Sequence, residues 1–377
     1  MQWLSRRVGG RANRRTSRFG SFGSRRGQSQ RGPAWRGRIW RRLVRAAVAA
    51  VMAGLLCALS TLFIVGSGAA DLYMHGLRRD TVSADGDNPF TDRVLYVDDD
   101  SSAAHAAEDK NADETSRAAA AQLASVPSSI WLEPDKLPPT RVGPAVTAVM
   151  KQAAYTGTMP VFVVYGIPGR DCGGYSASDM RDDEYVAWVQ EIVDAVSAWQ
   201  GVVPAVIVEP DALAMMTDCP ALESKMPLLT IAVRALATSG AAVYIDAGHS
   251  GWVDAETMAS LLLRAGVENV RGFSLNVSNY NVTAAERAYG EQLSQLTGGR
   301  YVIDTSRNGN GHGNEPDSAW CNVSGARVGE EPGATTYGAQ DAALWIKTPG
   351  ESDGTCNAGP QAGQWWPEQA ESLLGWS

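Results

Sequence analysis

The chain is poor in the residues that most often hold a metal ion or a phosphate group. Its 377 residues include only four histidines and five cysteines, and the metal-binding patterns Cys-x-x-Cys and His-Glu-x-x-His do not occur. No glycine-rich phosphate loop follows any strand that the sequence predicts. The sequence therefore argues against a zinc site, a dinucleotide and a nucleoside triphosphate. We expect no cofactor and no metal.

Basic residues are also scarce over most of the chain. The first 70 residues hold 14 arginines and no lysine, aspartate or glutamate, which leaves 19 basic against 41 acidic residues in the remainder. Such an acidic domain is a poor candidate for nucleic-acid binding, because clustered lysine and arginine are needed to neutralise phosphates. Its charge favours a neutral or cationic partner, and we expect a monomer.

Charge is absent altogether from residues 46–70, a stretch of 25 residues. As a helix it is long enough to cross a hydrocarbon core of roughly 30 Å. Five arginines lie before it, at positions 36, 38, 41, 42 and 45, so the positive-inside rule places the N-terminus in the cytoplasm and the remainder outside. We expect a single-pass membrane anchor; the alternative is a signal segment cleaved near Ala70, which would release a secreted protein.

This assignment divides the chain into four parts. Residues 1–45 are expected to be a basic disordered cytoplasmic tail and residues 46–70 the anchor or signal segment. Residues 71–87, which are charged and lack periodicity, are expected to be a linker. Residues 88–377 form the folded domain. The four cysteines beyond residue 70 suggest two disulfides in an oxidising compartment.

Strand-like and helix-like segments alternate along the folded domain. Residues 103–125, which are rich in alanine, are expected to form a helix. Repeated strand–helix units predict a parallel sheet with helices outside, as a barrel or a doubly wound sheet. The expected strands are 161–165, 205–208, 242–245, 272–275, 301–303 and 342–346, and helices are expected around the periodic stretch 186–196 and at 227–238, 255–264 and 284–296.

Polar residues follow each of these strands. In a (β/α) barrel the carboxyl ends of the strands share one mouth, so six segments are expected to converge on one acid-rich pocket. After residues 205–208, an extended backbone would place Glu209 and Asp211 on the same face. The residues in question are Arg170, Asp171, Glu209, Asp211, Asp246, His249, Asn276, Asn279, Asp304, Arg307, Lys347, Glu351 and Asp353.

Seven blocks form the most specific signal in the chain: VYGIPGRDC (164–172), VEPD (208–211), YIDAGHSGW (244–252), NVSNY (276–280), IDTSRNG (303–309), WCN (320–322) and WIKTPGESDG (345–354). In this order they resemble glycoside hydrolase family 6, the inverting endoglucanases and cellobiohydrolases that act on β-1,4-glucans. The resemblance covers most of residues 88–377, the expected catalytic domain. It implies an α/β fold, a distorted (β/α) barrel with fewer than eight parallel strands, preceded here by the membrane or signal helix.

The resemblance also implies catalytic roles for three aspartates. Inverting cleavage needs one protonated carboxyl to donate to the leaving oxygen and one ionised carboxylate to activate a water. Asp211 matches the acid, and Asp171 matches a neighbour that raises the pKa of Asp211. Asp353 matches the candidate base. An aspartate is ionised at neutral pH unless burial or a second negative charge raises its pKa, so Asp211 needs such surroundings. Glu209 is expected to be a supporting carboxylate.

The resemblance also offers a water relay through a loop serine as an alternative route to the base, and here the sequence departs from the common pattern. Ala177 falls where many relatives have that serine. Ser176 and Ser178 are the candidates to replace it in a water relay.

Further residues match substrate contacts or disulfides of the family. Glucan clefts combine aromatic platforms, which cover the apolar faces of sugar rings, with side chains that hydrogen-bond to hydroxyls. The resemblance implies disulfides between Cys172 and Cys219 and between Cys321 and Cys356. The platform positions are Trp131, Trp252 and Trp320, the tyrosine beneath the distorted ring is Tyr165, and the hydroxyl contacts are His249, Asn276, Lys347 and Glu351.

Short loops after Asp353 and between residues 308 and 320 predict an open cleft, hence an endo-β-1,4-glucanase that binds β-glucan polysaccharides. Exo action of the cellobiohydrolase type is one alternative. A non-catalytic, membrane-tethered glycan-binding protein on the same scaffold is another. A metal-dependent hydrolase that uses the many aspartates is the third and weakest.

Overall fold

The computed structural model describes residues 81–173, 180–313, 316 and 319–376. The tail, the charge-free stretch and most of the expected linker lie outside these residues. Among the described residues, we find no helix with the length and apolar character needed to cross a membrane.

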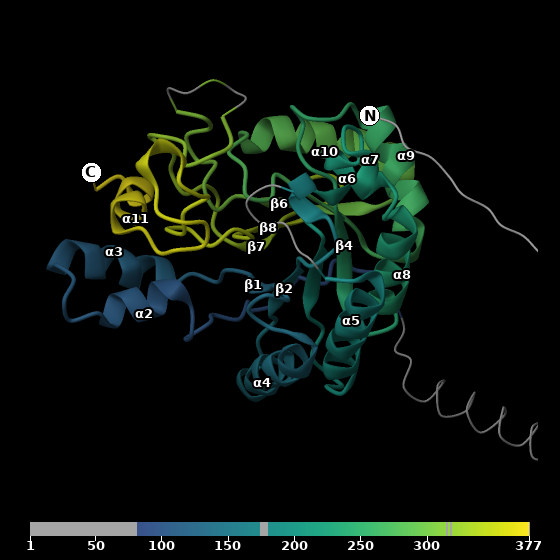
Figure 1. Ribbon diagram of the computed structural model, residues 1–377, viewed down its shortest axis with the longest axis horizontal. Helices are drawn as coiled ribbons and strands as arrows, with labels where there is room; N and C mark the ends of the chain where they lie inside the picture. The colour runs from purple at the N-terminus through teal and green to yellow at the C-terminus, as the bar shows by residue number, and fades with distance from the viewer. Residues whose placement is uncertain (1–80, 174–179, 314–315, 317–318, 377) are drawn as a thin grey trace, which may run out of the picture. The chain divides into compact units, whose positions relative to one another are not determined.

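An eight-stranded sheet organises the described domain (Figure 1). Its order is β1-β2-β3-β4-β5-β6-β8-β7, and every neighbouring pair is parallel except β7 with β8. The seven parallel strands confirm the expectation of fewer than eight. The strands are β1 Ile130–Leu132, β2 Val161–Val164, β3 Ala205–Val208, β4 Ala242–Asp246, β5 Gly272–Leu275, β6 Arg300–Asp304, β7 Gly333–Ala334 and β8 Gln340–Leu344.

The segments flanking β1 and β8 meet where the sheet curls round. The backbone N–H of Ser129, just before β1, donates a 2.9 Å hydrogen bond to the carbonyl of Trp345, just after β8. The indole N–H of Trp131 donates a 2.8 Å bond to the carbonyl of Ile346. These contacts join the first and last parallel strands of the sheet.

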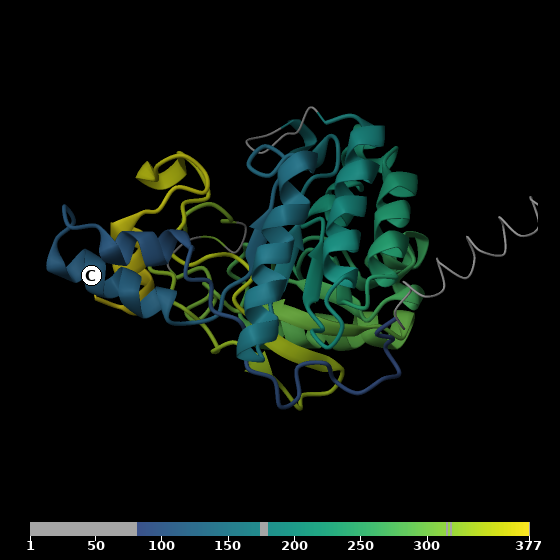
Figure 2. The same cartoon turned by 90° about the horizontal axis from the view of Figure 1, so that it is seen from below.

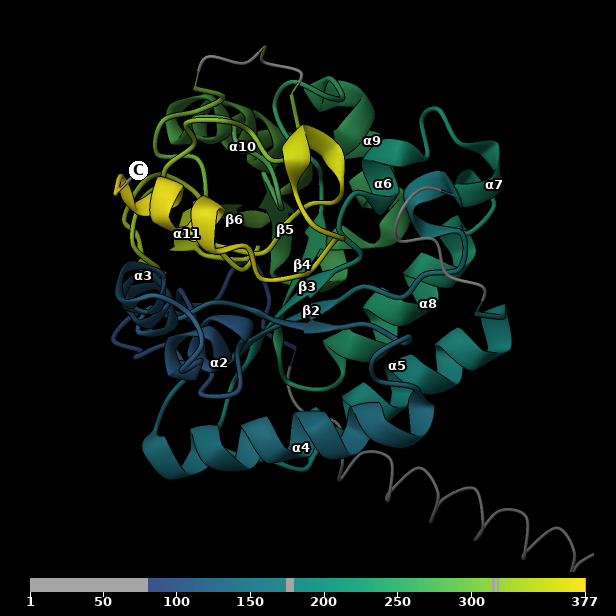
Figure 3. The ribbon, with the colours of Figure 1, turned by 60° about the vertical axis from the view of Figure 1, so that its left-hand side comes forward.

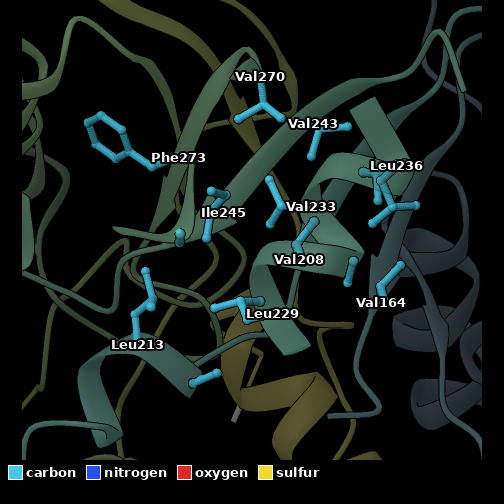
Figure 4. Packing of buried hydrophobic residues seen from close by; sticks show 14 of the residues in the cluster. Val164, Val208, Leu213, Leu229, Val233, Leu236, Val243, Ile245, Val270 and Phe273 are labelled. Carbon is cyan, nitrogen blue, oxygen red and sulfur yellow. The ribbon is translucent and has the colours of Figure 1, made fainter. Parts of the chain in front are cut away.

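Both faces of the sheet are buried, so its strands read as continuous apolar runs. In β3, Val206 and Val208 pack outward against helices, whereas Ala205 and Ile207 point into the barrel interior. Figure 4 shows part of the outer core, in which Val208, Val243 and Ile245 of the sheet face Leu229 and Val233 of α8.

Helices cover the outer face of the sheet in chain order (Figures 2 and 3). In sequence, α4 packs on α5, α5 on α8, α8 on α9, and α9 on α10. The helices are α2 Ser102–Glu108, α3 Glu114–Ala124, α4 Pro139–Thr156, α5 Asp182–Ser197, α6 Ala212–Met215, α7 Pro220–Glu223, α8 Met226–Ala237, α9 Ala255–Ala265, α10 Thr283–Thr297 and α11 Pro367–Leu374.

Helix α9 illustrates how the sequence determines these elements. Asp254 caps its N-terminus by accepting a 3.0 Å hydrogen bond from the Thr257 N–H. Met258, Leu262 and Ala265 recur at helical spacing and are buried. Gly266 ends the helix in the left-handed conformation that glycine adopts without penalty.

The expected helix over residues 103–125 is wrong in one respect. The structure has two helices there, α2 and α3, because Asp113 caps the start of α3 by accepting a 3.0 Å bond from the Ser116 N–H. Helix α3 packs against α11 from the other end of the chain, side by side with it in Figure 1. The sequence did not predict the three-residue β1, the helix α4 or the short elements α6, α7, β7 and α11.

Residues 81–86, within the expected linker, contact the folded domain near the amino ends of the strands. Arg271 Nη1 donates 2.7 Å bonds to the carbonyls of Ser83 and Gly86. The same arginine is buried and pairs through Nε and Nη2, at 2.8 Å each, with the carboxylate of Asp341. Tyr244 donates a 2.7 Å bond to the same carboxylate.

Candidate active site

A cavity of about 950 Å³ opens at the carboxyl ends of the parallel strands. Segments in or after all seven parallel strands supply its walls, as expected for a barrel mouth. One lining residue from each is Trp131 in β1, Tyr165 after β2, Asp211 after β3, His249 after β4, Asn279 after β5, Trp320 after β6 and Lys347 after β8.

The structure brings ten of the residues expected in the site to this one cavity. They come from segments up to 222 positions apart in the sequence, which only the folded sheet places together. They are Trp131, Tyr165, Asp171, Asp211, His249, Trp252, Trp320, Lys347, Glu351 and Asp353.

Asn276, expected as a substrate contact, does not line the cavity. Its side chain is fully buried. The amide Nδ2 donates to the carbonyls of Asp304 at 2.9 Å and Asn281 at 3.2 Å, and Oδ1 accepts from the Asn281 N–H at 3.1 Å. These bonds use the side chain to shape the loop after β5, and Asn279 of the same loop faces the cavity instead.

The turn after β3 also differs from the expectation. The backbone does not stay extended, because Glu209 has φ +52° and Asp211 has φ +67°. Both residues therefore lie in the left-handed region that non-glycine residues rarely adopt. The turn separates their side chains: Glu209 is 1% exposed and bonds inside the protein, whereas Asp211 lines the cavity.

Asp211 sits in a strongly acidic setting. Its backbone N–H donates a 2.8 Å bond to Oδ2 of Asp246. Burial raises the pKa of the Asp211 carboxyl well above its usual range, and the charges of Asp246, Asp171 and Asp353 raise it further.

Asp246, the last residue of β4, is better placed to carry the negative charge. Burial raises its pKa to about 7, but the N–H groups of Asp211 and Gly248 and the hydroxyl of Ser274 donate to it at 2.8, 3.0 and 2.9 Å. Three donors favour an ionised carboxylate. Of the two neighbours, Asp211 is therefore the one that keeps a proton.

Asp171 is held in a tight turn, Arg170–Gly173, in which both Asp171 and Cys172 have positive φ. Cys172 forms the expected disulfide with Cys219. On the other side, Arg170 is 2% exposed and donates from Nη1 to the Tyr165 carbonyl at 2.7 Å. The turn that presents Asp171 is therefore anchored on both sides.

Asp353 is bound by a buried arginine. Nη1 of Arg307 lies 2.8 Å from both carboxylate oxygens. Oδ2 also accepts from the Tyr280 hydroxyl at 2.8 Å and the Asn322 N–H at 2.9 Å. Since a carboxylate oxygen offers about two lone pairs, Oδ1 is the atom that keeps an acceptor position for water.

The second expected disulfide, between Cys321 and Cys356, is also confirmed. It joins the segment that carries Trp320 to the loop that follows Asp353. Asn322 strengthens the same junction, because its side-chain oxygen accepts a 2.8 Å bond from the Asp353 N–H.

Aromatic side chains lie along the cavity. Trp131 and Tyr165 pack edge to face with ring centroids 5.4 Å apart, and Trp252 lies 5.5 Å from the His249 ring. Trp252 and Trp320 are 37% and 54% exposed. Exposed indoles in a cavity are available to a ligand, whereas a tryptophan used for packing is buried, as Trp345 is.

His249 is neutral at physiological pH, because burial and the nearby His312 lower its pKa to about 4. Its Nδ1 lies 3.2 Å from the Gly251 N–H and 2.7 Å from Nδ2 of Asn281. Asn281 Nδ2 also donates to Glu286 at 2.9 Å, which orients the amide. With Nδ1 accepting, Nε2 carries the proton and is the hydrogen-bond donor of the ring.

Lys347 and Glu351 form a loose pair at 3.8 Å. Ser102 of α2 donates a 2.7 Å bond to the Glu351 carboxylate. This contribution of α2 was not predicted, because the helix expected over residues 103–125 carried no site residue. It also missed lining residues of the loop after β1, which are Glu133, Asp135 and Lys136.

Two remaining expectations concern the water relay and metals. Ser176 and Ser178 lie outside the described residues. Among the residues that are described, no group of three or more histidine, cysteine, aspartate or glutamate side chains is arranged to hold a metal ion.

Comparisons with known proteins agree with this geometry. The family model "Glycosyl hydrolases family 6" matches residues 90–376. Endoglucanase A of Cellulomonas fimi is 48% identical over 221 residues, which cover 58% of this chain and 47% of that protein. The match thus spans about half the length of that relative. A probable 1,4-β-D-glucan cellobiohydrolase C of Aspergillus niger is 31% identical, with 78% of each chain covered.

Among solved structures, the endoglucanase Cel6 of Mycobacterium tuberculosis, in complex with methyl-cellobiosyl-4-deoxy-4-thio-β-D-cellobioside, superposes with a TM-score of 0.71. The sequences are 43% identical, and the match covers 76% of this chain and 98% of that one. The family match over nearly the whole described domain, on a curled parallel sheet of the same kind, shows that the chain belongs to glycosyl hydrolases family 6.

Proposed function

We propose that this protein hydrolyses internal β-1,4-glucosidic bonds of β-glucans with inversion of the anomeric configuration. One observation carries the proposal: three aspartates, Asp171, Asp211 and Asp353, from the segments after β2, β3 and β8 line one cavity, and Asp211 lies among acidic neighbours that raise its pKa. The relatives named endoglucanases and the ligand in the Mycobacterium tuberculosis structure support the β-1,4-glucan substrate.

Asp211 is proposed as the general acid. Its proton passes to the glycosidic oxygen as the bond to the anomeric carbon breaks, so the leaving sugar departs neutral. A carboxyl must hold a proton near neutral pH to act in this way, and the acidic surroundings of Asp211 raise its pKa as this role requires. Asp171 and Asp246 contribute negative charge and do not donate protons.

Asp353 is proposed to act on the attacking water. Oδ1 keeps an acceptor position for a water that lies on the face of the sugar opposite Asp211, and Arg307 fixes the plane of the carboxylate. A relay through Ser176 or Ser178 is the alternative route for the same proton.

The aromatic and polar lining residues are proposed to bind the glucan. Trp131, Trp252 and Trp320 present indole faces to sugar rings, and Tyr165 lies beneath the ring next to the scissile bond. Hydroxyl groups are bound by His249, Lys347 and Glu351. None of these contacts requires a cofactor.

Endo action is proposed because the loop after Asp353 folds on itself. Ser352 donates to the Gln364 carbonyl and accepts through its own carbonyl from Gly363, both at 2.9 Å, and Trp366 donates to Gly350 at 2.8 Å. At the rim, Gly363 of this loop lies near Lys136, whose side chain is 64% exposed and forms a 2.7 Å ion pair with Glu133. Viscosity of a soluble cellulose derivative should drop early in the reaction; slow loss of viscosity with steady cellobiose release would favour exo action.

The decisive experiment compares the full chain with its Asp211→Asn variant on a panel of soluble β-glucans followed by NMR. The α-anomer should appear first with the native chain, and the variant should lose at least about 100-fold in kcat. Unchanged turnover by Asp211→Asn, or a β-anomer first, would overturn the assignment. Binding without new reducing ends would instead support the glycan-binding alternative.

We also propose that residues 46–70 tether the enzyme to a membrane with the catalytic domain outside the cytoplasm, or direct its secretion. Fractionation of cells that express the full chain and a chain lacking residues 1–70 separates these cases. The full chain should resist carbonate extraction if the segment is an anchor, and should appear in the medium if it is cleaved.

A further inference from the structure

A buried carboxylate connects the two catalytic loops. Glu209 accepts hydrogen bonds from the Gly166 N–H at 3.0 and 3.1 Å and from the Ile167 N–H at 2.9 Å. Those amides begin the loop that carries Asp171. Glu209 itself directly follows β3 and stands two residues before Asp211. The carboxylate therefore ties the Asp171 loop to the turn that presents Asp211.

Helix α5 supports this carboxylate from the outer side of the sheet. The hydroxyl of Tyr185 donates a 2.7 Å bond to Oε1 of Glu209, and Tyr185 is fully buried. Its ring stacks on Trp188 with centroids 6.2 Å apart. Trp188 in turn fills the space behind Gly166, where a Cβ would lie only 2.9 Å from its ring. The start of the loop has no room to move toward α5.

We infer that Tyr185 and Glu209 are a positioning pair that sets the place of Asp171 relative to Asp211. The inference rests on the proposed function, because it assigns a consequence to the acid role of Asp211. Neither residue lines the cavity. Both act through the backbone of the loop and not through contact with substrate.

The pair acts on the protonation of Asp211. The carboxylates that face Asp211 come from three elements: Asp246 from β4, Asp171 from the loop after β2 and Asp353 from the loop after β8. Arg170 is the positive group that faces Glu209. If the loop loosens, the charge of Asp171 moves away from Asp211, and Asp211 loses its proton at a lower pH. The loss of activity at high pH should then begin at a lower pH than in the native protein.

The test is the pH dependence of kcat/KM of the full chain on hydroxyethylcellulose, an uncharged soluble β-1,4-glucan. Tyr185→Phe removes one hydrogen bond and keeps the stacked ring. We expect its basic limb to move down by about half a pH unit, which is roughly threefold less activity above the pKa. The acidic limb should stay where it is.

Variants of Glu209 separate position from charge. Glu209→Ala removes every bond to the loop and should move the basic limb further than Tyr185→Phe does. Glu209→Gln keeps an oxygen for the Gly166 and Ile167 amides and offers its NH₂ group to the Tyr185 oxygen. The Glu209→Gln variant should therefore keep most of the native pH dependence of kcat/KM.

Tyr244→Phe is the matched control, since it removes another 2.7 Å bond from a buried tyrosine to a carboxylate, that of Asp341 near the amino ends of the strands. It should lower Tm by a similar amount and leave the pH profile unchanged. Profiles of Tyr185→Phe and Glu209→Ala that superimpose on the native one, or an equal shift in Tyr244→Phe, would overturn the inference. A native chain that cuts no glucan at any pH would instead overturn the proposed function.

Discussion

Arg307 and Asp353 form a largely buried ion pair at the edge of the cavity, with side chains 0% and 7% exposed and Nη1 of Arg307 2.8 Å from Oδ1. Burying two charges is costly, and the pair is tolerated because Tyr280 and Asn322 also donate to the carboxylate. The candidate base is therefore part of the protein's internal structure as well as of its active site.

Removing one member of this pair should destabilise the protein strongly. Asp353→Ala leaves the Arg307 guanidinium buried without its counter-ion, and we expect the free energy of unfolding in urea to fall by about 3–5 kcal/mol. The double variant Asp353→Ala with Arg307→Met should recover part of that loss. A single variant within about 1 kcal/mol of the native chain would contradict this account of the pair.

Stability should fall as pH rises from about 4.5 to about 7. Burial raises the pKa of Glu209 from 4.5 to about 7, so in this range the folded state binds more protons than the unfolded state does. The stabilising contribution of Glu209 is present in full below its pKa in the unfolded chain. It is lost as the pH rises through its pKa in the folded chain. The loss is on the order of 3 kcal/mol.

Glu209→Gln tests this pH dependence, because it removes the titration and keeps the shape. Urea unfolding at several pH values should give a shallower decline for the variant. Asp246 contributes a slope of the same sign, since burial raises its pKa to about 7 as well. Equal slopes in the native chain and the variant would show that Glu209 does not titrate in this range.

Removal of the disulfide between Cys172 and Cys219 should lower activity by more than the loss of stability explains. Closing a loop with a sequence separation of 47 residues stabilises by about 4 kcal/mol on the chain-entropy model. Cys172 also follows Asp171 directly. Replacing both cysteines with serine should lower kcat at temperatures far below the new Tm. Full activity there would show that the bridge serves stability alone.

Trp320 should contribute to glucan binding. Its side chain lines the cavity and is 54% exposed. We expect Trp320→Ala to cost on the order of 1–2 kcal/mol of binding, which is roughly a five- to thirtyfold higher Kd for a cello-oligosaccharide measured by calorimetry. Trp376 is 45% exposed and is not among the residues that line the cavity, so Trp376→Ala is the matched control and should leave the Kd unchanged.

Much of the site was predictable from local sequence, because its residues stand in short blocks at strand ends. The six longest parallel strands follow from apolar runs, and nine of the ten cavity residues stand in such blocks. Trp131 and the two disulfide pairings were implied by the family resemblance. β1 was missed because three residues carry too little periodicity to be distinguished from a loop. Asn276 was misassigned because a polar residue in a family block can serve the loop itself.

What the sequence determined by itself is the alternation of strands and helices, the polar residues after each strand and the family to which they belong. These are local properties, encoded in apolar periodicity and in contiguous motifs. Only the tertiary structure decided which carboxylate lies inside the protein and which faces the cavity. Glu209 and Asp211 are two residues apart, yet left-handed turns aim one at Tyr185 and backbone amides and the other at the cavity. Burial and neighbouring charge are properties of the folded chain, so the protonation of Asp211 depends on segments that the sequence places far apart.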